Sequence, residues 1–166
     1  MHLPPNNPAR RPVQSSRTRT APALGAAPSP LGHPAYSQTL PCTPESARRA
    51  RLLVTAACTA WGLPGLADAA ALVVSELIGN SVRHSGSRLV RVQVSLPEPE
   101  RIRVAVMDTS RTPPAHRATD ADAETGTEDG RGLVVIEALA DRWGTELLRR
   151  GKRVYVELCP EKDGRE

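Results

Sequence analysis

The segment SELIGNSVRHS, residues 75–85, decides how the chain is expected to fold. It lies in a run whose apolar residues recur every three or four positions, which is typical of a helix with one buried face. The expected helix starts near Pro64 and Asp68 and ends near His84. Its expected buried arc consists of Ala70, Val74, Leu77 and Ser81, flanked by Val73 and Ile78.

Three polar residues interrupt this helix at helical spacing. Glu76, Asn80 and Arg83 are four and three residues apart, so they project from one side, rotated away from the buried arc. One interpretation is a solvent-facing stripe with a Glu–Arg attraction, and the other is the wall of a binding site. The spacing by itself favours the solvent-facing stripe.

The charge distribution bears on the kind of partner. The chain has 166 residues, a mass of 17.8 kDa and a net charge of +4, which fits one domain plus a tail. Residues 1–44 hold four arginines and no acid, so the remainder has 22 − 4 = 18 bases against 18 acids. The basic excess belongs to the tail, and we expect no direct nucleic-acid binding.

Cysteine usage and hydropathy favour a cytoplasmic protein. The three cysteines are odd in number and widely spaced, which fits neither a zinc site nor a disulfide framework. We also expect no apolar run of the length of a membrane span, and therefore no membrane association.

The chain divides into three parts by composition. Residues 1–40 are rich in Pro, Ala, Ser, Thr and Arg and are expected to be a disordered tail, residues 41–160 a folded domain, and residues 161–166 a disordered C-terminus. Order is expected to begin near Thr43, as the N-cap of a first helix with Pro44 at its first position. The expected inward residues of that helix are Ala50, Leu53, Val54, Ala57 and Trp61.

After the second helix the pattern changes to alternation, which indicates strands. Residues 89–96 and 101–108 alternate apolar and polar side chains around a turn at 97–100. A polar loop over 109–129, a helix over 132–141, and a strand pair over 145–150 and 153–159 follow. Strand pairs adjacent in sequence predict an α+β fold, a two-layer sandwich of a mainly antiparallel sheet with helices on one face.

Two further stretches carry candidate site residues. Asp108 ends its strand on the same side as Val104 and Val106, so it either points into the layer between sheet and helices or caps the following turn. Gly130 and Gly132 stand directly before a helix, where backbone N–H groups can approach an anion. Each signal is weak alone.

Together the stretches SELIGNSVRHS, VMDTSRTPP and GRGLVVIEALADRWG resemble the nucleotide site of the GHKL ATPases. Within that superfamily the chain is similar to the anti-sigma-factor serine kinases and related small ATP-binding regulators. The resemblance covers roughly residues 43–158 and implies a Bergerat-type ATP-binding fold. It also implies ATP and Mg²⁺ as ligands, a sigma factor and an anti-anti-sigma protein as partners, and a homodimer.

The resemblance implies a role for each matching residue. Glu76 corresponds to the carboxylate that polarises a nucleophile, and Asn80 to the amide that coordinates the magnesium ion between the phosphates. Asp108 corresponds to the acceptor of the adenine amino group. In chemical terms, a neutral amide oxygen holds a hard cation without adding charge, and a carboxylate one turn earlier can accept a hydroxyl proton.

The remaining nucleotide contacts follow from the same resemblance. Gly130 and Gly132 match the glycines that approach the phosphates, and Arg131 between them is placed at the terminal phosphate. Ser110 is a further expected contact, although many members carry a glycine there and another at the position of Thr112. The loop over 109–129 corresponds to the flexible lid of the family.

Four functions remain open on the sequence. The first is an ATP-dependent protein serine/threonine kinase that acts as an anti-sigma factor, and the second is a nucleotide-responsive binding module without phosphoryl transfer. The third, a sensor histidine kinase fragment, is disfavoured because we identify no preceding dimerisation helix with a phosphoacceptor histidine. The fourth is an α/β domain whose polar stripe is only solvated.

Overall fold

The computed structural model describes residues 32–112 and 131–161 of the chain. In chain order the elements are β1 (Ala35–Pro41), α1 (Ser46–Ala60), η1 (Pro64–Leu66), α2 (Ala67–His84), β2 (Leu89–Glu98), β3 (Arg101–Asp108), α3 (Arg131–Leu139), β4 (Arg142–Leu147) and β5 (Lys152–Leu158).

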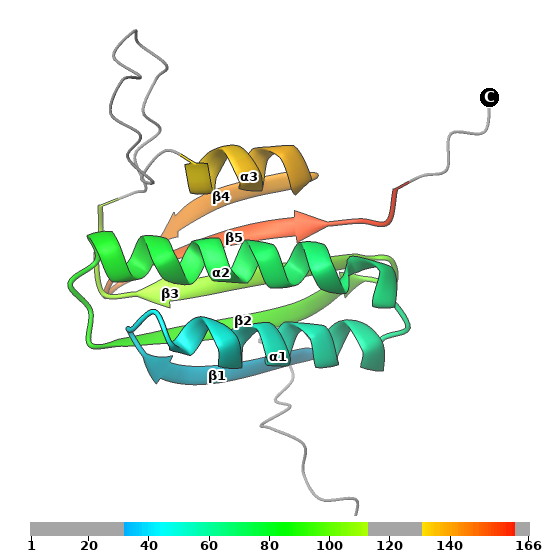
Figure 1. The fold of residues 1–166 in the computed structure, drawn as a ribbon, viewed down its shortest axis with the longest axis horizontal. Coiled ribbons are helices and arrows are strands. Elements are labelled where there is room, and N and C mark those ends of the chain that lie inside the picture. The colour runs from blue at the N-terminus through cyan, green and yellow to red at the C-terminus, as the bar shows by residue number, and fades with distance from the viewer. Residues whose placement is uncertain (1–31, 113–130, 162–166) are drawn as a thin grey trace, which may run out of the picture.

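The strands of the described part form one sheet in the order β1-β2-β3-β5-β4, and every neighbouring pair is antiparallel. All three α-helices lie on the same face of this sheet (Figure 1). The predicted α+β two-layer sandwich is therefore confirmed. Helices α1 and α2 run side by side, and α3 lies beside α2 at the β5–β4 side of the sheet.

The first strand corrects the predicted extent of the tail. Residues 35–40, assigned to the disordered segment, belong to β1, which pairs with β2 from Ala35 opposite Ser95 to Pro41 opposite Leu89. Only Tyr36 and Leu40 are apolar on its inner face, so the local pattern is weak. The strand depends on pairing with residues about 50 to 60 positions away, which no local pattern reports.

The start of α1 is also corrected. Thr43 is not its N-cap, because the helix begins at Ser46 after a turn in which the Ser46 N–H donates to the Thr43 carbonyl at 3.1 Å. The Ser46 hydroxyl donates to the Pro41 carbonyl at 2.7 Å, which ties the helix start to the end of β1. The predicted inward residues Ala50, Leu53, Val54 and Ala57 are buried, while Trp61 follows the last helical residue and is half-buried.

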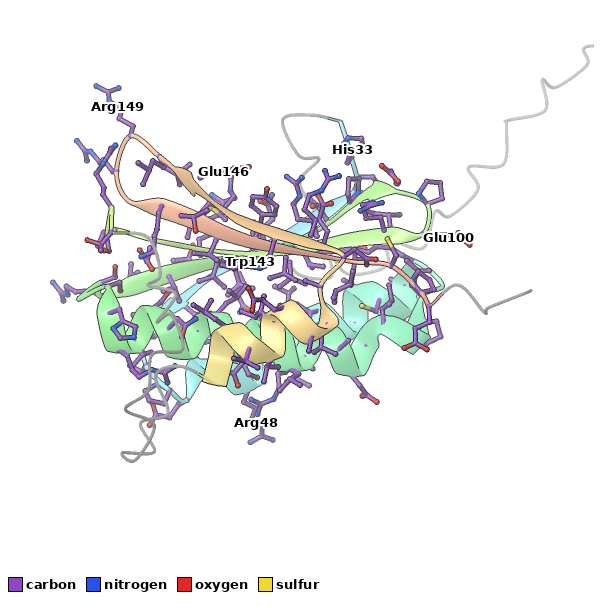
Figure 2. All side chains as sticks on the ribbon, turned by 90° about the horizontal axis from the view of Figure 1, so that it is seen from above. His33, Arg48, Glu100, Trp143, Glu146 and Arg149 are labelled. Carbon is purple, nitrogen blue, oxygen red and sulfur yellow. The ribbon has the colours of Figure 1, made fainter. Side chains whose placement is uncertain are left out.

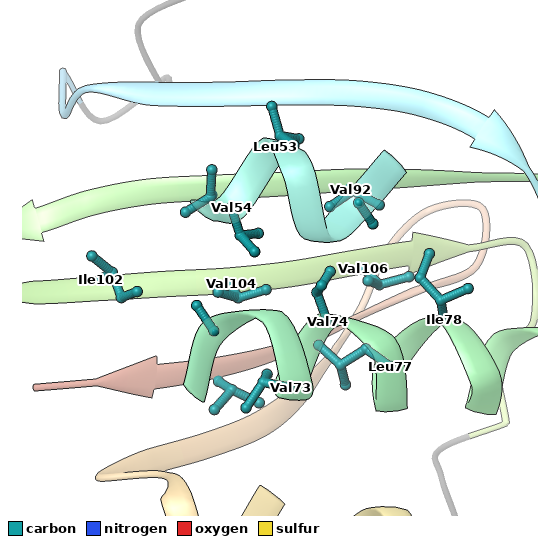
Figure 3. Close-up of a cluster of buried hydrophobic side chains, with 14 of the residues drawn as sticks. Leu53, Val54, Val73, Val74, Leu77, Ile78, Val92, Ile102, Val104 and Val106 are labelled. Carbon is teal, nitrogen blue, oxygen red and sulfur yellow. The ribbon is translucent and has the colours of Figure 1, made fainter. Parts of the chain in front are cut away.

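Helix α2 lies at the centre of the core. The segment Pro64–His84 is long and apolar enough to cross a membrane by length and composition, so the expectation that no such run exists is wrong. In the fold its apolar face packs on the sheet, and its side chains meet those of β2 and β3 (Figure 3). The buried residues are those predicted, namely Ala70, Val73, Val74, Leu77, Ile78 and Ser81.

The face of the sheet opposite the helices, on which Glu146 lies in Figure 2, also carries the buried carboxylate of Glu157. Glu157 is 3% exposed and accepts hydrogen bonds from Arg103 Nε at 2.9 Å and Arg101 Nη1 at 3.1 Å. Burial acts to raise the pKa of Glu157, but the hydrogen bonds and charges of Arg103 and then Arg101 outweigh it and lower the pKa below its ordinary 4.5. The Arg103 guanidinium also stacks on Tyr155, 4.6 Å from the ring centre.

We predict that Glu157→Gln lowers the free energy of unfolding by about 1.5–3 kcal/mol at neutral pH, because two arginines lose hydrogen bonds to a charged acceptor. Since the folded-state pKa of Glu157 is lowered, its stabilisation is complete above the unfolded value of 4.5 and is lost as pH falls through the folded value. Urea unfolding at about pH 7 and about pH 3 measures both effects, with the exposed Glu100→Gln as control. A difference from wild type that does not shrink in acid contradicts the prediction.

Candidate functional site

Glu76 and Asn80 lie outside the buried face of α2, on the side of the helix that meets the start of α3. Glu76 and Asn80 are both partly exposed, whereas Leu77 and Ser81, the residues that directly follow them, are buried. Successive residues of a helix point about 100° apart. The burial of one face against the sheet therefore fixes the direction of Glu76 and Asn80.

The start of α3 lies directly against these two side chains. A Cβ placed on Gly132 would lie 2.6 Å from Glu76 Oε2 and 3.5 Å from Asn80 Oδ1. Carbon and oxygen do not normally approach to 2.6 Å without a bond, so with Glu76 in this position only glycine fits. The stripe on α2 is consequently not a purely solvated face, and three of the predicted site residues meet at one point.

Asn80 is held in place by Arg83, one turn further along α2. Arg83 Nη2 donates to Asn80 Oδ1 at 3.0 Å. The guanidinium passes over Gly79, where an added Cβ would lie 3.2 Å from Arg83 Nη1. Glycine in a helix interior costs about 1 kcal/mol relative to alanine, and here it leaves room for this contact. The amide oxygen keeps a second lone pair that can bind a cation.

Asp108 combines both predicted interpretations of its role. Its side chain is 2% exposed and points into the layer between sheet and helices, where its Oδ2 accepts a hydrogen bond from Ser81 Oγ at 2.8 Å. Its Oδ1 accepts from the backbone N–H of Ser110 at 3.0 Å, which caps the following turn. A carboxylate in such a place needs a compensating cation, and Lys152 supplies it.

Lys152 is the site residue that the sequence analysis missed. Its Nζ lies 3.0 Å from Asp108 Oδ1 and 3.1 Å from Oδ2, and its side chain is 6% exposed. The predicted strand pair over 145–150 and 153–159 leaves Lys152 in the turn, but Lys152 begins β5 and lies directly opposite Asp108. A signal existed, since Lys152 has the same parity as Val154 and Val156, which are buried.

The chain after β3 is held by further hydrogen bonds. Thr109 N–H donates to Ser87 Oγ at 2.9 Å, and Arg111 Nη1 donates to the Leu148 carbonyl at 2.7 Å. Ser110, predicted to contact the nucleotide, is partly exposed, and its Oγ accepts from the Thr112 N–H at 3.2 Å. Of the predicted lid over 109–129, the structure describes residues 109–112.

The other predicted phosphate contacts are placed in part. Gly130 lies outside the described residues. Arg131 is the first residue of α3, and only its backbone is described. Gly132 is buried in the first turn of the same helix.

Two consecutive residues of α2 join the parts of the candidate site. Asn80 faces Gly132, and Ser81 donates to Asp108. The carboxylate at the strand end, the amide on α2 and the glycine that opens α3 therefore belong to one constellation. It offers one amide oxygen for a cation, one partly exposed carboxylate as a proton acceptor, and one buried ion pair.

We predict that Gly132→Ala and Glu76→Ala are coupled in a double-mutant cycle. In the wild type the added methyl group forces the Glu76 carboxylate to move, which should cost about 1 kcal/mol of folding free energy. In Glu76→Ala the collision is absent and alanine is the better helix former, so the same change should be neutral or slightly stabilising.

Urea unfolding of the four proteins measures the coupling. Gly65→Ala serves as control, because an added Cβ there meets nothing within 4 Å. Additive effects of Gly132→Ala and Glu76→Ala would show that the two residues do not touch in solution.

Comparisons with known proteins identify the family of the chain. The model of the histidine kinase-like ATPase domain matches residues 40–158. Among solved structures, the histidine kinase domain of the Erythrobacter litoralis EL346 blue-light activated histidine kinase is 18% identical with a TM-score of 0.41, over 72% of this chain and 61% of that chain. A comparison with curated proteins returns no significant match. Because the family match covers well over half of the chain, the protein belongs to the histidine kinase-like, or GHKL-type, ATPase domain family.

Proposed function

We propose that the protein binds Mg-ATP between α2, the end of β3 and the start of α3, and uses it as a regulatory protein serine/threonine kinase. Family membership supports ATP binding. The observation that carries the site is the contact of Gly132 with Glu76 and Asn80, because a side chain at position 132 would fill the space against both. We assign Asp108 to the recognition of the adenine ring. The remaining nucleotide contacts are assigned to Gly130, Arg131, Gly132 and Ser110.

The donor set fits a magnesium ion that the phosphates help to bind. Among residues 32–112 and 131–161, no group of three or more His, Cys, Asp or Glu could hold a metal ion. Mg²⁺ usually takes few protein ligands and keeps phosphate and water oxygens around it. Asn80 Oδ1 is the protein oxygen we assign to it. When bound, the ion neutralises charge on the phosphates.

Glu76 is assigned the role of proton acceptor in phosphoryl transfer to a serine or threonine of a partner protein. Its carboxylate is partly exposed and lies beside the proposed metal ligand. A carboxylate in this position can take the hydroxyl proton as the oxygen attacks the terminal phosphate. We further propose that the protein acts as a cytoplasmic anti-sigma factor in a partner-switching pathway, with a sigma factor and an anti-anti-sigma protein as partners and a homodimer as its assembly.

A second candidate function is a nucleotide-responsive protein-binding module without kinase activity. It uses the same nucleotide site as the kinase, so the hydrogen bonds that Asp108 accepts from Ser81, Ser110 and Lys152 bear on both candidates alike. Direct base recognition by Asp108 would require one of them to give way. The two candidates differ in phosphoryl transfer, which a kinase should lose when the Glu76 carboxylate is removed and which a binding module does not perform.

We predict that Asn80→Ala reduces magnesium-dependent ATP affinity by at least about tenfold while the fold is retained, since the assigned metal ligand is lost. Isothermal titration calorimetry with and without Mg²⁺ measures this change. Gln93→Ala, which removes an amide from the opposite face of the sheet, is the matched control. Wild-type affinity in Asn80→Ala would refute the metal assignment.

We predict that Glu76→Gln binds Mg-ATP like the wild type but transfers phosphate to its partner about 10²–10⁴-fold more slowly, because the amide cannot accept the proton. Single-turnover transfer of the labelled terminal phosphate to an anti-anti-sigma protein measures the rate, and Glu100→Gln is the control. Equal rates of phosphate transfer in wild type and Glu76→Gln exclude Glu76 as the proton acceptor. A wild type that binds Mg-ATP but transfers no phosphate favours the binding module.

A further inference from the structure

The carboxylate of Asp108, which we assign to the recognition of the adenine ring, has no acceptor position left. Asp108 accepts from Ser81 Oγ at 2.8 Å, from the Ser110 N–H at 3.0 Å, and from Lys152 Nζ at 3.0 and 3.1 Å. A carboxylate offers about four lone-pair positions, so the chain itself uses all of them. A base that approaches this point therefore meets a saturated acceptor.

The unused hydrogen-bonding capacity belongs to Lys152. An ammonium group has three N–H donors, and both hydrogen bonds of Lys152 go to the two oxygens of Asp108. Within residues 32–112 and 131–161 its third donor has no acceptor. Both side chains of the pair are almost fully buried, at 6% exposure for Lys152 and 2% for Asp108. A buried donor without an acceptor costs about 1–3 kcal/mol, which a ligand acceptor could recover.

The backbone fixes Lys152 at this place. Lys152 lies directly opposite Asp108 in the β3–β5 pair. The preceding Gly151 has φ +98°, and a Cβ there would lie 1.7 Å from the Asp108 carbonyl oxygen. Only glycine allows the two strands to approach so closely. The ammonium is thereby part of the strand end and does not depend on a loop.

We propose that Lys152 determines the base specificity of the site by donating a hydrogen bond to an acceptor on the edge of the purine. This inference rests on the nucleotide function proposed above. A carboxylate alone offers only acceptors and repels the oxygen of a 6-oxopurine. The ammonium beside it offers a charged donor to that oxygen, or to N1 of adenine. The site is therefore expected to accept 6-oxopurine triphosphates as well as ATP, with Lys152 responsible for the wider range.

ATP and ITP test the proposal, because they differ only in the 6-amino against the 6-oxo group with its N1 proton. Calorimetric titration of the wild-type protein with both magnesium nucleotides should give dissociation constants within about tenfold of each other. Binding of ATP with rejection of ITP by more than that overturns the role of Lys152 and leaves the proposed function in place. Failure of both nucleotides to bind overturns the proposed function together with this inference.

Lys152→Met provides the second arm. We expect the substitution to weaken the binding of ITP at least about tenfold more than the binding of ATP. The 6-oxo group of ITP loses a hydrogen-bond donor on which its binding depends more strongly. Arg150→Met, the same loss of charge at an exposed position of the β4–β5 hairpin, should leave the ITP-to-ATP ratio unchanged. Equal weakening of both nucleotides in Lys152→Met overturns the proposal. Circular dichroism checks the fold, and if the unpaired Asp108 unfolds the variant, the wild-type ratio decides alone.

Discussion

The packing of one face of α2 against the sheet is the constraint on which the site depends. Leu77 and Ser81 are buried there, and their burial turns Glu76 and Asn80 toward α3. A rotation of α2 by one residue would expose apolar side chains and carry both polar groups away from Gly132. The hydrophobic effect on the apolar face of α2 thus sets the direction of Glu76 and Asn80, although these two polar side chains are not part of that apolar face.

The buried pair of Asp108 and Lys152 is the second element that organises this end of the molecule. It links β3 to β5, and through Ser81 it also links the sheet to α2. Two opposite charges in such a place add little net stability compared with apolar residues, but removal of one partner is costly. The net contribution of the pair to stability is therefore smaller than its two charges suggest. The ion cluster around Glu157 on the other face of the sheet shows a similar pairing without any relation to the candidate site.

Local periodicity predicted the parts of the fold that depend on one buried face. The inward residues of α2 follow from spacing alone and are observed, whereas spacing left open whether Asp108 points inward or caps the following turn, and the structure shows that it does both. Strand β1 could not be predicted in this way, because its pairing partner lies about 50 to 60 residues away and its own pattern is weak. Lys152 was missed because a lysine beside a glycine is typical of a turn, whereas its buried place depends on the carboxylate across the strand pair. The placement of Gly132 and Glu76 in one site was inferred only through a family resemblance, since the two residues lie far apart in sequence, and their direct contact was not predicted.

The central claim is that one ligand contacts α2, the end of β3 and the start of α3 together. Backbone amide chemical shifts of ¹⁵N-labelled protein during titration with Mg-ATP test it most directly. The account predicts large shifts at Asn80, Ser81, Ser110 and Gly132, and little change at Glu100, at the opposite end of β3 (Figure 2). Shifts centred on the β2–β3 turn, or no shifts at a nucleotide concentration that saturates binding, would contradict it.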